Sequence, residues 1–130
     1  MARTRLPHPT DGELAILRVL WQRGPSRLSA IGEALSAKRK VALTTVATML
    51  KIMKRKGQVT RIVDLEGVRW EAVLTQAKAG SRLLSNLVSR VFEGSAQKVV
   101  LHLLDEGHLS AGDQEEIRKL LAARARKSRR

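Results

Sequence analysis

Cysteine is absent from this chain of 130 residues, and aromatic side chains are scarce, with two Trp, one Phe and no Tyr. Without Cys the chain has no disulfide and no thiolate metal site, which indicates a reducing compartment such as a bacterial cytoplasm. Because aromatic rings are scarce, any core must consist mainly of Leu, Val, Ile and Ala. Long hydrophobic runs are missing as well, so we expect a cytoplasmic protein with no membrane span and no secretory signal.

Negative charge is the next shortage. The chain has 25 Lys and Arg against 12 Asp and Glu, a formal net charge of +13. No acidic residue lies between Glu33 and Asp64, whereas residues 75–117 hold 4 basic and 6 acidic residues. A cationic excess of this size predicts a polyanionic partner, and its concentration in one segment predicts one main binding surface.

Helical periodicity is present from the start of the chain. Thr10 with Glu13 three residues later is a capping-box pattern, so a first helix should begin there and end at Gly24. Ser26 is expected to cap a second, shorter helix that ends near Ala37. Two short helices joined by a tight turn are therefore predicted before the acid-free segment.

That acid-free segment predicts a third helix, from about Leu43 to Lys56. Apolar residues recur on one of its faces: Val46, Met49, Leu50 and Met53. The opposite face collects small polar and cationic groups: Thr44, Thr48, Lys51 and Arg55. Such a ridge suits the major groove of duplex DNA, where Lys and Arg reach guanine or phosphate and Thr reaches thymine methyl groups.

The next stretch, QVTRIVDLEGVRWEAV, alternates with a period of two around a turn at residues 64–67, which predicts a β-hairpin. Three helices followed by a two-stranded ribbon are the order of a winged helix, so we predict a mainly α fold with a small hairpin wing. Arg61 and Arg69 flank the turn and are expected to contact phosphates. The predicted DNA-binding residues are Lys38, Arg39, Lys40, Thr44, Thr45, Thr48, Lys51, Arg55, Arg61 and Arg69.

Apolar stripes at helical spacing return after residue 76 and predict three more helices, the second capped by Ser95 and the third by Ser110 with Asp113. One chain can hardly bury so much apolar surface in so short a segment, which predicts a homodimer with a shared helical core. The expected interface residues are Leu83, Leu87, Val91, Phe92, Val100, Leu104, Ile117, Leu120 and Leu121. The predicted organisation is a winged-helix domain at 1–75, a helical dimerisation domain at 76–124 and a basic tail at 125–130.

Nearly the whole chain is spanned by three stretches: ELAILRVLWQRGPSRLSAI, ALTTVATMLKIMKRKGQVTR and VFEGSAQKVVLHLLDEGHLSAGDQEEI. In this order they resemble the opening helix and turn, the recognition helix and the dimerisation block of the penicillinase-repressor family (the BlaI/MecI/CopY group) of winged-helix transcription regulators. The resemblance implies a winged-helix domain, a helical dimerisation domain, and a homodimer that represses transcription by binding a palindromic operator in duplex DNA.

The chain departs from the family pattern at three points. Leu43 stands where family members often carry Tyr, so a contact made by that ring is not carried over. Val91 precedes Phe92, whereas the β-lactamase regulators have an Asn-Phe bond that is cleaved after a membrane sensor protease is triggered. The Cys-rich metal site of the copper-responsive members is absent. An upstream sensor or protease is thus unassigned, and no cofactor or metal is expected.

Other interpretations stand beside these predictions. The basic run also fits a solvated helix face, the Thr residues fit local capping, and the C-terminal stripes fit a core within one chain. Ser95 with Lys98 matches the acylation motif S-x-x-K, and His102, Glu106 and His108 could hold a metal, but no catalytic constellation accompanies them, so an enzyme is not expected. The rival function is a winged helix that binds structured RNA or a protein without operator specificity.

Overall fold

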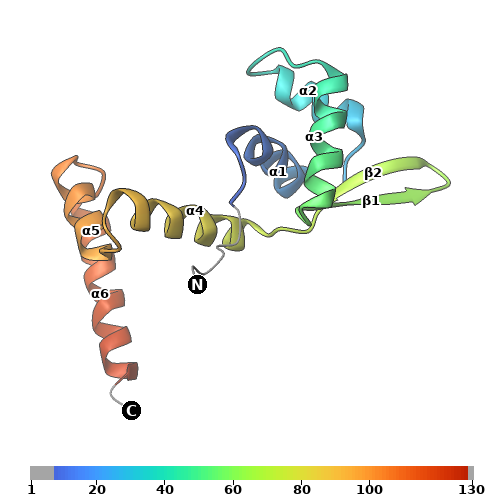
Figure 1. The fold of residues 1–130 in the computed structure, drawn as a ribbon. Helices are drawn as coiled ribbons and strands as arrows, with labels where there is room; N and C mark the ends of the chain where they lie inside the picture. The colour runs from blue at the N-terminus through green and yellow to red at the C-terminus, as the bar shows by residue number, and fades with distance from the viewer. Residues whose placement is uncertain (1–7, 129–130) are drawn as a thin grey trace, which may run out of the picture. The chain divides into compact units, whose positions relative to one another are not determined.

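The computed structural model describes residues 8–128, which form helices and one two-stranded antiparallel sheet (Figure 1). The elements are α1 (Asp11–Arg23), α2 (Leu28–Ser36), α3 (Leu43–Arg55), β1 (Val59–Asp64), β2 (Gly67–Ala72), α4 (Gln76–Val91), α5 (Ala96–Asp105) and α6 (Ala111–Ser128). The predicted order of three helices, a hairpin and three further helices is confirmed. Among the helices described, none has the length and apolar character needed to cross a membrane.

Tertiary contacts divide the chain into a first compact unit that ends at Asn86 and a second that begins at Leu87. The first half of α4 therefore belongs to the first unit, in which Ala79 is buried. The functional boundary between residues 75 and 76 stays a prediction, since packing within a single chain does not define which part of α4 serves a dimer.

Helix α1 begins as the sequence predicts. The Glu13 amide donates to Thr10 Oγ1 over 3.2 Å, and the Thr10 amide donates to Glu13 Oε1 over 3.0 Å. These two bonds complete the capping box and satisfy donors that would otherwise be left without partners at the start of the helix.

The predicted start of α2 is wrong by one residue. Arg27, rather than Ser26, is the N-cap, and it makes no side-chain cap bond. Ser26 instead forms an isolated β-bridge with Trp70, in which the two amide-to-carbonyl distances are 2.9 and 2.7 Å. Its hydroxyl donates to the Gly24 carbonyl over 2.8 Å. The backbone of Ser26 is thus bonded to β2 and its hydroxyl to the preceding turn, so the side chain does not cap the helix.

Helices α1, α2 and α3 pack with the hairpin around one apolar core in the first unit. Its buried residues are Ile16, Leu17, Val19, Leu20, Ile31, Val46, Leu50, Met53, Val59, Trp70, Leu74 and Ala79. Aliphatic side chains dominate this set, as the scarcity of aromatic residues predicts. The core fixes the orientation of α3, because three of its residues are anchored there.

The second unit has helix caps but no buried helix face. Ser95 Oγ accepts the Lys98 amide over 3.2 Å, and Ser110 and Asp113 exchange bonds of 3.0 and 3.1 Å, so both predicted caps are confirmed. A turn with positive φ at Glu93 and Gly94 joins α4 to α5. None of the described residues of α5 or α6 is buried. This unit therefore encloses no core of its own within a single chain.

Candidate nucleic-acid interface

Helix α3 has two chemically different faces. The apolar residues Val46, Leu50 and Met53 are fully buried, each with 0% of its surface exposed. The predicted contact residues on the opposite face are all exposed: Thr44, Thr48, Lys51 and Arg55. Thr45, at the margin of this face, is exposed as well. Because the core holds one side of the helix, the cationic and hydroxyl groups on the other side are presented to solvent as one ridge.

Thr48 has a defined orientation on this ridge. Its hydroxyl donates to the Thr44 carbonyl over 2.9 Å, one turn back along the helix. The hydroxyl proton is therefore engaged locally, as the capping alternative supposes, whereas the oxygen can still accept a bond from outside the helix.

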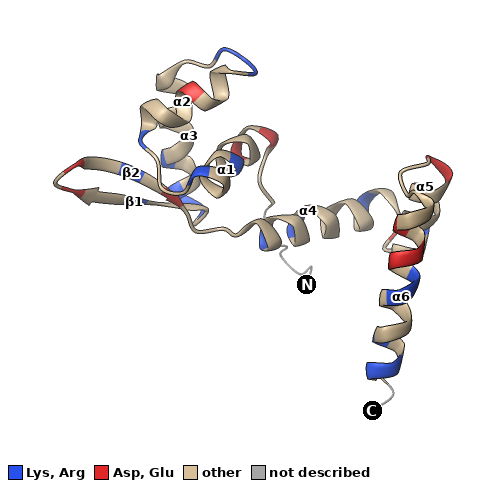
Figure 2. Cartoon of the chain, turned by 180° about the vertical axis from the view of Figure 1, so that it is seen from behind, with Lys and Arg blue, Asp and Glu red and all other residues tan. Residues whose placement is uncertain are grey.

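The loop between α2 and α3 adds three cations, Lys38, Arg39 and Lys40, all exposed. The amides of Lys38 and Arg39 both donate to the Leu35 carbonyl over 3.2 Å, which continues the helical turn past the end of α2. Figure 2 shows this loop in blue where the chain leads from α2 towards α3, with other basic groups along α3 itself. Within residues 8–128 none of these three side chains forms an ion pair.

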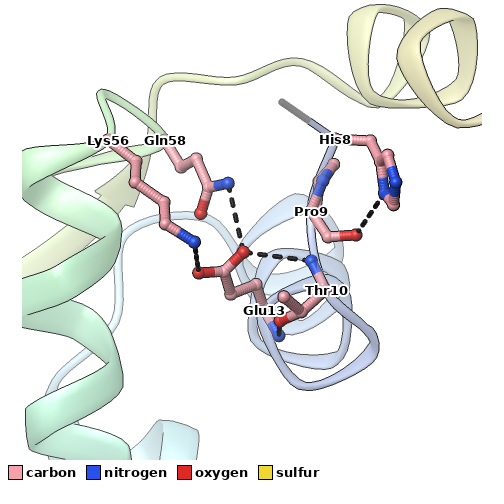
Figure 3. A network of polar contacts seen from close by, with 6 residues as sticks. All are labelled: His8, Pro9, Thr10, Glu13, Lys56 and Gln58. Atoms are coloured by element: carbon pink, nitrogen blue, oxygen red, sulfur yellow. Dashed lines mark hydrogen bonds and ion pairs between the residues drawn. The ribbon is translucent and has the colours of Figure 1, made fainter. Parts of the chain in front are cut away.

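Lys56 is the exception in the acid-free segment, because its side chain forms an ion pair within the described residues. Its Nζ lies 2.7 Å from Oε2 of Glu13, a carboxylate only 6% exposed (Figure 3). Gln58 donates to the other oxygen of Glu13 over 3.3 Å, and the Thr10 amide shares that oxygen. One of the cations counted in the sequence therefore ties the end of α3 to the start of α1, and its charge is balanced by Glu13.

This network also controls the charge state of Glu13. Burial is the largest single influence and opposes ionisation, but the bonds from Lys56, Thr10 and Gln58 together outweigh it and hold the pKa below its ordinary value of 4.5. Glu13 is thus a carboxylate at neutral pH, and the pair stabilises the contact between α1 and the C-terminal end of α3.

The two arginines of the wing, Arg61 and Arg69, lie in different environments. The hairpin register pairs Arg61 with Trp70 and Ile62 with Arg69. Because directly paired residues share a face and successive residues alternate, Arg61 and Arg69 lie on opposite faces of the ribbon. Arg61 is exposed, whereas the Arg69 guanidinium is 2.7 Å from Asp64 in an ion pair. Arg61 and Arg69 both flank the turn as expected, on different faces of the ribbon, and their role as phosphate contacts stays a prediction.

The tip of the wing is acidic and apolar. Asp64 and Glu66 surround Leu65, whose side chain is fully exposed, and Figure 2 shows the acidic colour at the end of the hairpin. The amide of Glu66 and the guanidinium of Arg69 both bond Asp64 and lower the pKa of its carboxyl group. The guanidinium of Arg27, before α2, donates to the Glu66 carbonyl. Arg27 is a residue that the sequence reasoning missed, since only the three-dimensional fold brings it to the wing.

The predicted dimer residues are largely uncovered in the single chain. Leu83 and Phe92 are partly buried, and Phe92 makes an edge-to-face contact with His102 at 5.6 Å between ring centroids. The other seven expose between 36% and 66% of their surface: Leu87, Val91, Val100, Leu104, Ile117, Leu120 and Leu121. These seven exposed residues are called the apolar face below. The assignment of these residues to a dimer interface stays a prediction.

Comparison with known proteins assigns the family. The model of the family described as penicillinase repressor matches residues 9–123. The chain belongs to the penicillinase repressor family. It is 30% identical to the transcriptional regulator BlaI of Mycobacterium tuberculosis over 114 residues, which cover 86% of this chain and 81% of BlaI. It is 19% identical to the methicillin resistance regulatory protein MecI of Staphylococcus aureus over 112 residues, covering 86% of this chain and 91% of MecI.

Among solved structures, the fold is similar to apo wild-type MarR from E. coli, with a TM-score of 0.48 and 20% sequence identity over 88% of this chain and 77% of MarR. The family resemblance predicted from the three sequence stretches is confirmed by the family match. The curated relatives are named as regulators of transcription or of resistance, and none of those described above is named as an enzyme.

One departure of this penicillinase-repressor family member has a visible packing role. Leu43, the first residue of α3, is 49% exposed and lies over Gly32 of α2. A Cβ added at Gly32 would come within 2.6 Å of the Leu43 side chain. Leu43 therefore packs the start of α3 against α2.

Proposed function

We propose that this chain is a homodimeric transcriptional repressor that recognises a palindromic operator by placing α3 of each subunit in the major groove of duplex DNA. The observation that carries the proposal is the separation of the two faces of α3, with Val46, Leu50 and Met53 buried and Lys51 and Arg55 exposed. Membership of the penicillinase repressor family supports the same function. An α-helix fits the width of the major groove, where base edges can be read.

The contacts divide into two groups. Lys51 and Arg55, with Thr44 and Thr48, are assigned to base edges or to the nearest phosphates, because they form the ridge of α3 itself. Lys38, Arg39, Lys40 and Arg61 are assigned to phosphates and supply affinity that depends on salt and not on sequence. Arg69 contributes less than Arg61, because its guanidinium already bonds Asp64.

The apolar face is assigned to the dimer. Removing this surface from water is favourable by about 25 cal/mol per Å², which can offset the cost of association when many residues contribute. A two-fold axis between the subunits would place the two α3 helices on one side of the duplex, about 34 Å or a multiple of it apart. Operator half-sites should have the same spacing.

The decisive experiment selects bound fragments from the source genome with the purified full-length chain and determines their shared sequence. A palindrome with half-sites one or two helical turns apart is the expected result. Gel-shift titrations of that duplex are then repeated with random duplex and with hairpin RNA as competitors. Equal competition by random duplex would contradict operator specificity, and preferential competition by hairpin RNA would favour the RNA-binding alternative.

A further inference from the structure

Helices α1, α2 and α3 enclose an open groove of about 650 Å³ within the first unit. Its floor is apolar and consists of Ala15, Val19, Ala34, Leu35, Val41 and Met49. Both the volume and the apolar lining are typical of sites that take small organic molecules. The groove lies beside the proposed DNA-binding face, and its apolar floor has no part in the proposed DNA contacts.

The rim of the groove is strongly cationic. Arg18 and Arg23 come from α1, and Lys38 and Arg39 come from the loop after α2. All four are exposed, and in the described part of the chain none of them forms an ion pair. The single acidic residue of the lining is Asp11. Four cations against one carboxylate leave an uncompensated positive charge around an apolar floor.

We propose that this groove binds a small amphipathic anion, namely a carboxylate carried on a compact apolar body. The apolar body would cover the aliphatic floor, and the carboxylate would bond the arginines at the rim. Arg favours this pairing because its planar guanidinium donates two parallel bonds to a carboxylate. A neutral molecule of the same shape would gain only the apolar contact.

The groove shares residues with the proposed DNA-binding surface, so the coupling of the two sites rests on the proposed function. Lys38, Arg39 and Thr45 line the groove and are also assigned to DNA. A carboxylate that engages Lys38 and Arg39 removes them from phosphates, and an anion placed there repels the backbone. Binding of the anion and of DNA is therefore antagonistic, and by linkage each weakens the other by the same factor.

The binding arm of the test uses the full-length chain without DNA, and 2-naphthoate as the probe. Calorimetry gives the affinity, and amide chemical shifts in 15N-labelled protein give the location. Shift changes are expected in α1, in α2 and in the loop at residues 38–40. The neutral analogue 2-naphthalenemethanol is expected to bind at least tenfold more weakly. Equal affinity for the two compounds, or shift changes confined to other elements, would overturn the proposal.

Matched variants separate the groove from the general positive charge of the chain. Arg18→Gln combined with Arg23→Gln should weaken naphthoate binding about tenfold or more. Arg124→Gln combined with Arg126→Gln removes the same charge from α6 and should change the affinity for naphthoate less than twofold. Ala34→Leu should abolish binding by filling the floor, with an unchanged circular dichroism spectrum. Wild-type affinity in the first and third variants would overturn the proposal.

The coupling arm adds duplex DNA. Saturating 2-naphthoate is expected to weaken duplex binding at least threefold in the wild type and not in Ala34→Leu. Unchanged DNA affinity in the wild type would overturn the coupling. The two proposals can fail separately. If an operator is found but naphthoate does not bind, only the proposal of an anion site in the groove is overturned. If naphthoate binds but no operator is found, only the proposal of a sequence-specific repressor is overturned.

Discussion

The buried side chain of Glu13 bonds both to its neighbours in the sequence and to residues far along the chain. Thr10 and Glu13 were predicted as a capping box, and the structure confirms that role. The same carboxylate also receives Lys56 and Gln58, more than forty residues along the chain. The local half of the interaction follows a fixed sequence spacing, whereas the distant half depends on the tertiary fold.

Replacing this carboxylate with an amide should remove a pH-dependent contribution to stability. Because the pKa of Glu13 is lowered in the folded state, its ionised form stabilises the fold above its ordinary pKa of 4.5. That stabilisation is lost as the pH falls through the folded-state pKa. Urea unfolding should show Glu13→Gln about 1–3 kcal/mol less stable than the wild type at pH 7.

The difference in unfolding free energy between Glu13→Gln and the wild type should shrink as the pH is lowered below 4.5. The exposed carboxyls with lowered pKa, Asp64 and Glu115, are present in both proteins and cancel in the difference. A difference that stays constant down to pH 3 would contradict the role of the charged pair.

Two arginines close to each other in sequence should have different effects on DNA binding. Arg55→Ala should lower discrimination between operator and random duplex by about 1–3 kcal/mol, because Arg55 lies on the ridge of α3. Arg39→Ala should weaken both duplexes alike and reduce the slope of log K against log salt by about 1, because Arg39 lies in the preceding loop. Fluorescence anisotropy at several salt concentrations measures both. Equal loss of discrimination in the two variants would refute the division of contacts.

At the scale of elements, α3 and the wing differ in how far the sequence predicts them. The faces of α3 follow from a helical period, and three of its four predicted stripe residues are fully buried. The strands and turn of the wing were also predicted. The predicted turn at residues 64–67 already fixes the register that puts Arg61 and Arg69 on opposite faces, whereas the ion pair between Arg69 and Asp64 was not predicted, because it depends on side-chain conformation.

The ion pair within the wing should restrain DNA binding. Asp64→Asn removes the partner of Arg69 and one negative charge from the tip, so the guanidinium becomes available to phosphate. Affinity for any duplex should rise, and the salt slope should become steeper by about 1. Asp105→Asn makes the same charge change on α5, in the second unit, and serves as the control. Gel shifts in which both variants behave alike would show that only net charge matters.

At the scale of the whole molecule, the sequence predicted which surfaces are cationic and which are apolar and exposed better than it predicted individual contacts. An acid-free segment indicated the cationic surface, and apolar stripes in the C-terminal half indicated the surface that a single chain leaves uncovered. The turn at Ser26 and the role of Arg27 were not predicted, because both depend on contacts with the hairpin some forty residues away. The assignment of the apolar face to a dimer stays a prediction.

Charged residues in the apolar face should separate the subunits. Leu120→Asp combined with Leu121→Asp places two carboxylates in the proposed shared core, where burying a charge is costly. Sedimentation equilibrium should show the dimer dissociation constant raised by at least about 100-fold, and operator affinity should fall with it. Leu65→Asp is the control, because Leu65 is equally apolar and fully exposed but lies at the wing tip. A dimer that survives the double substitution would move the interface elsewhere.

Gln58 links parts of the first unit that the sequence keeps apart. Gln58 is only 2% exposed. Its backbone amide donates to the Met53 carbonyl over 2.9 Å, and its backbone carbonyl accepts the backbone amides of Val73 and Leu74 over 2.8 and 3.0 Å. The last turn of α3 and the segment that enters α4 are therefore both hydrogen-bonded to the backbone of one residue, Gln58. A displacement of residues 73–74 is therefore expected to shift the end of α3 as well, because both are hydrogen-bonded to Gln58.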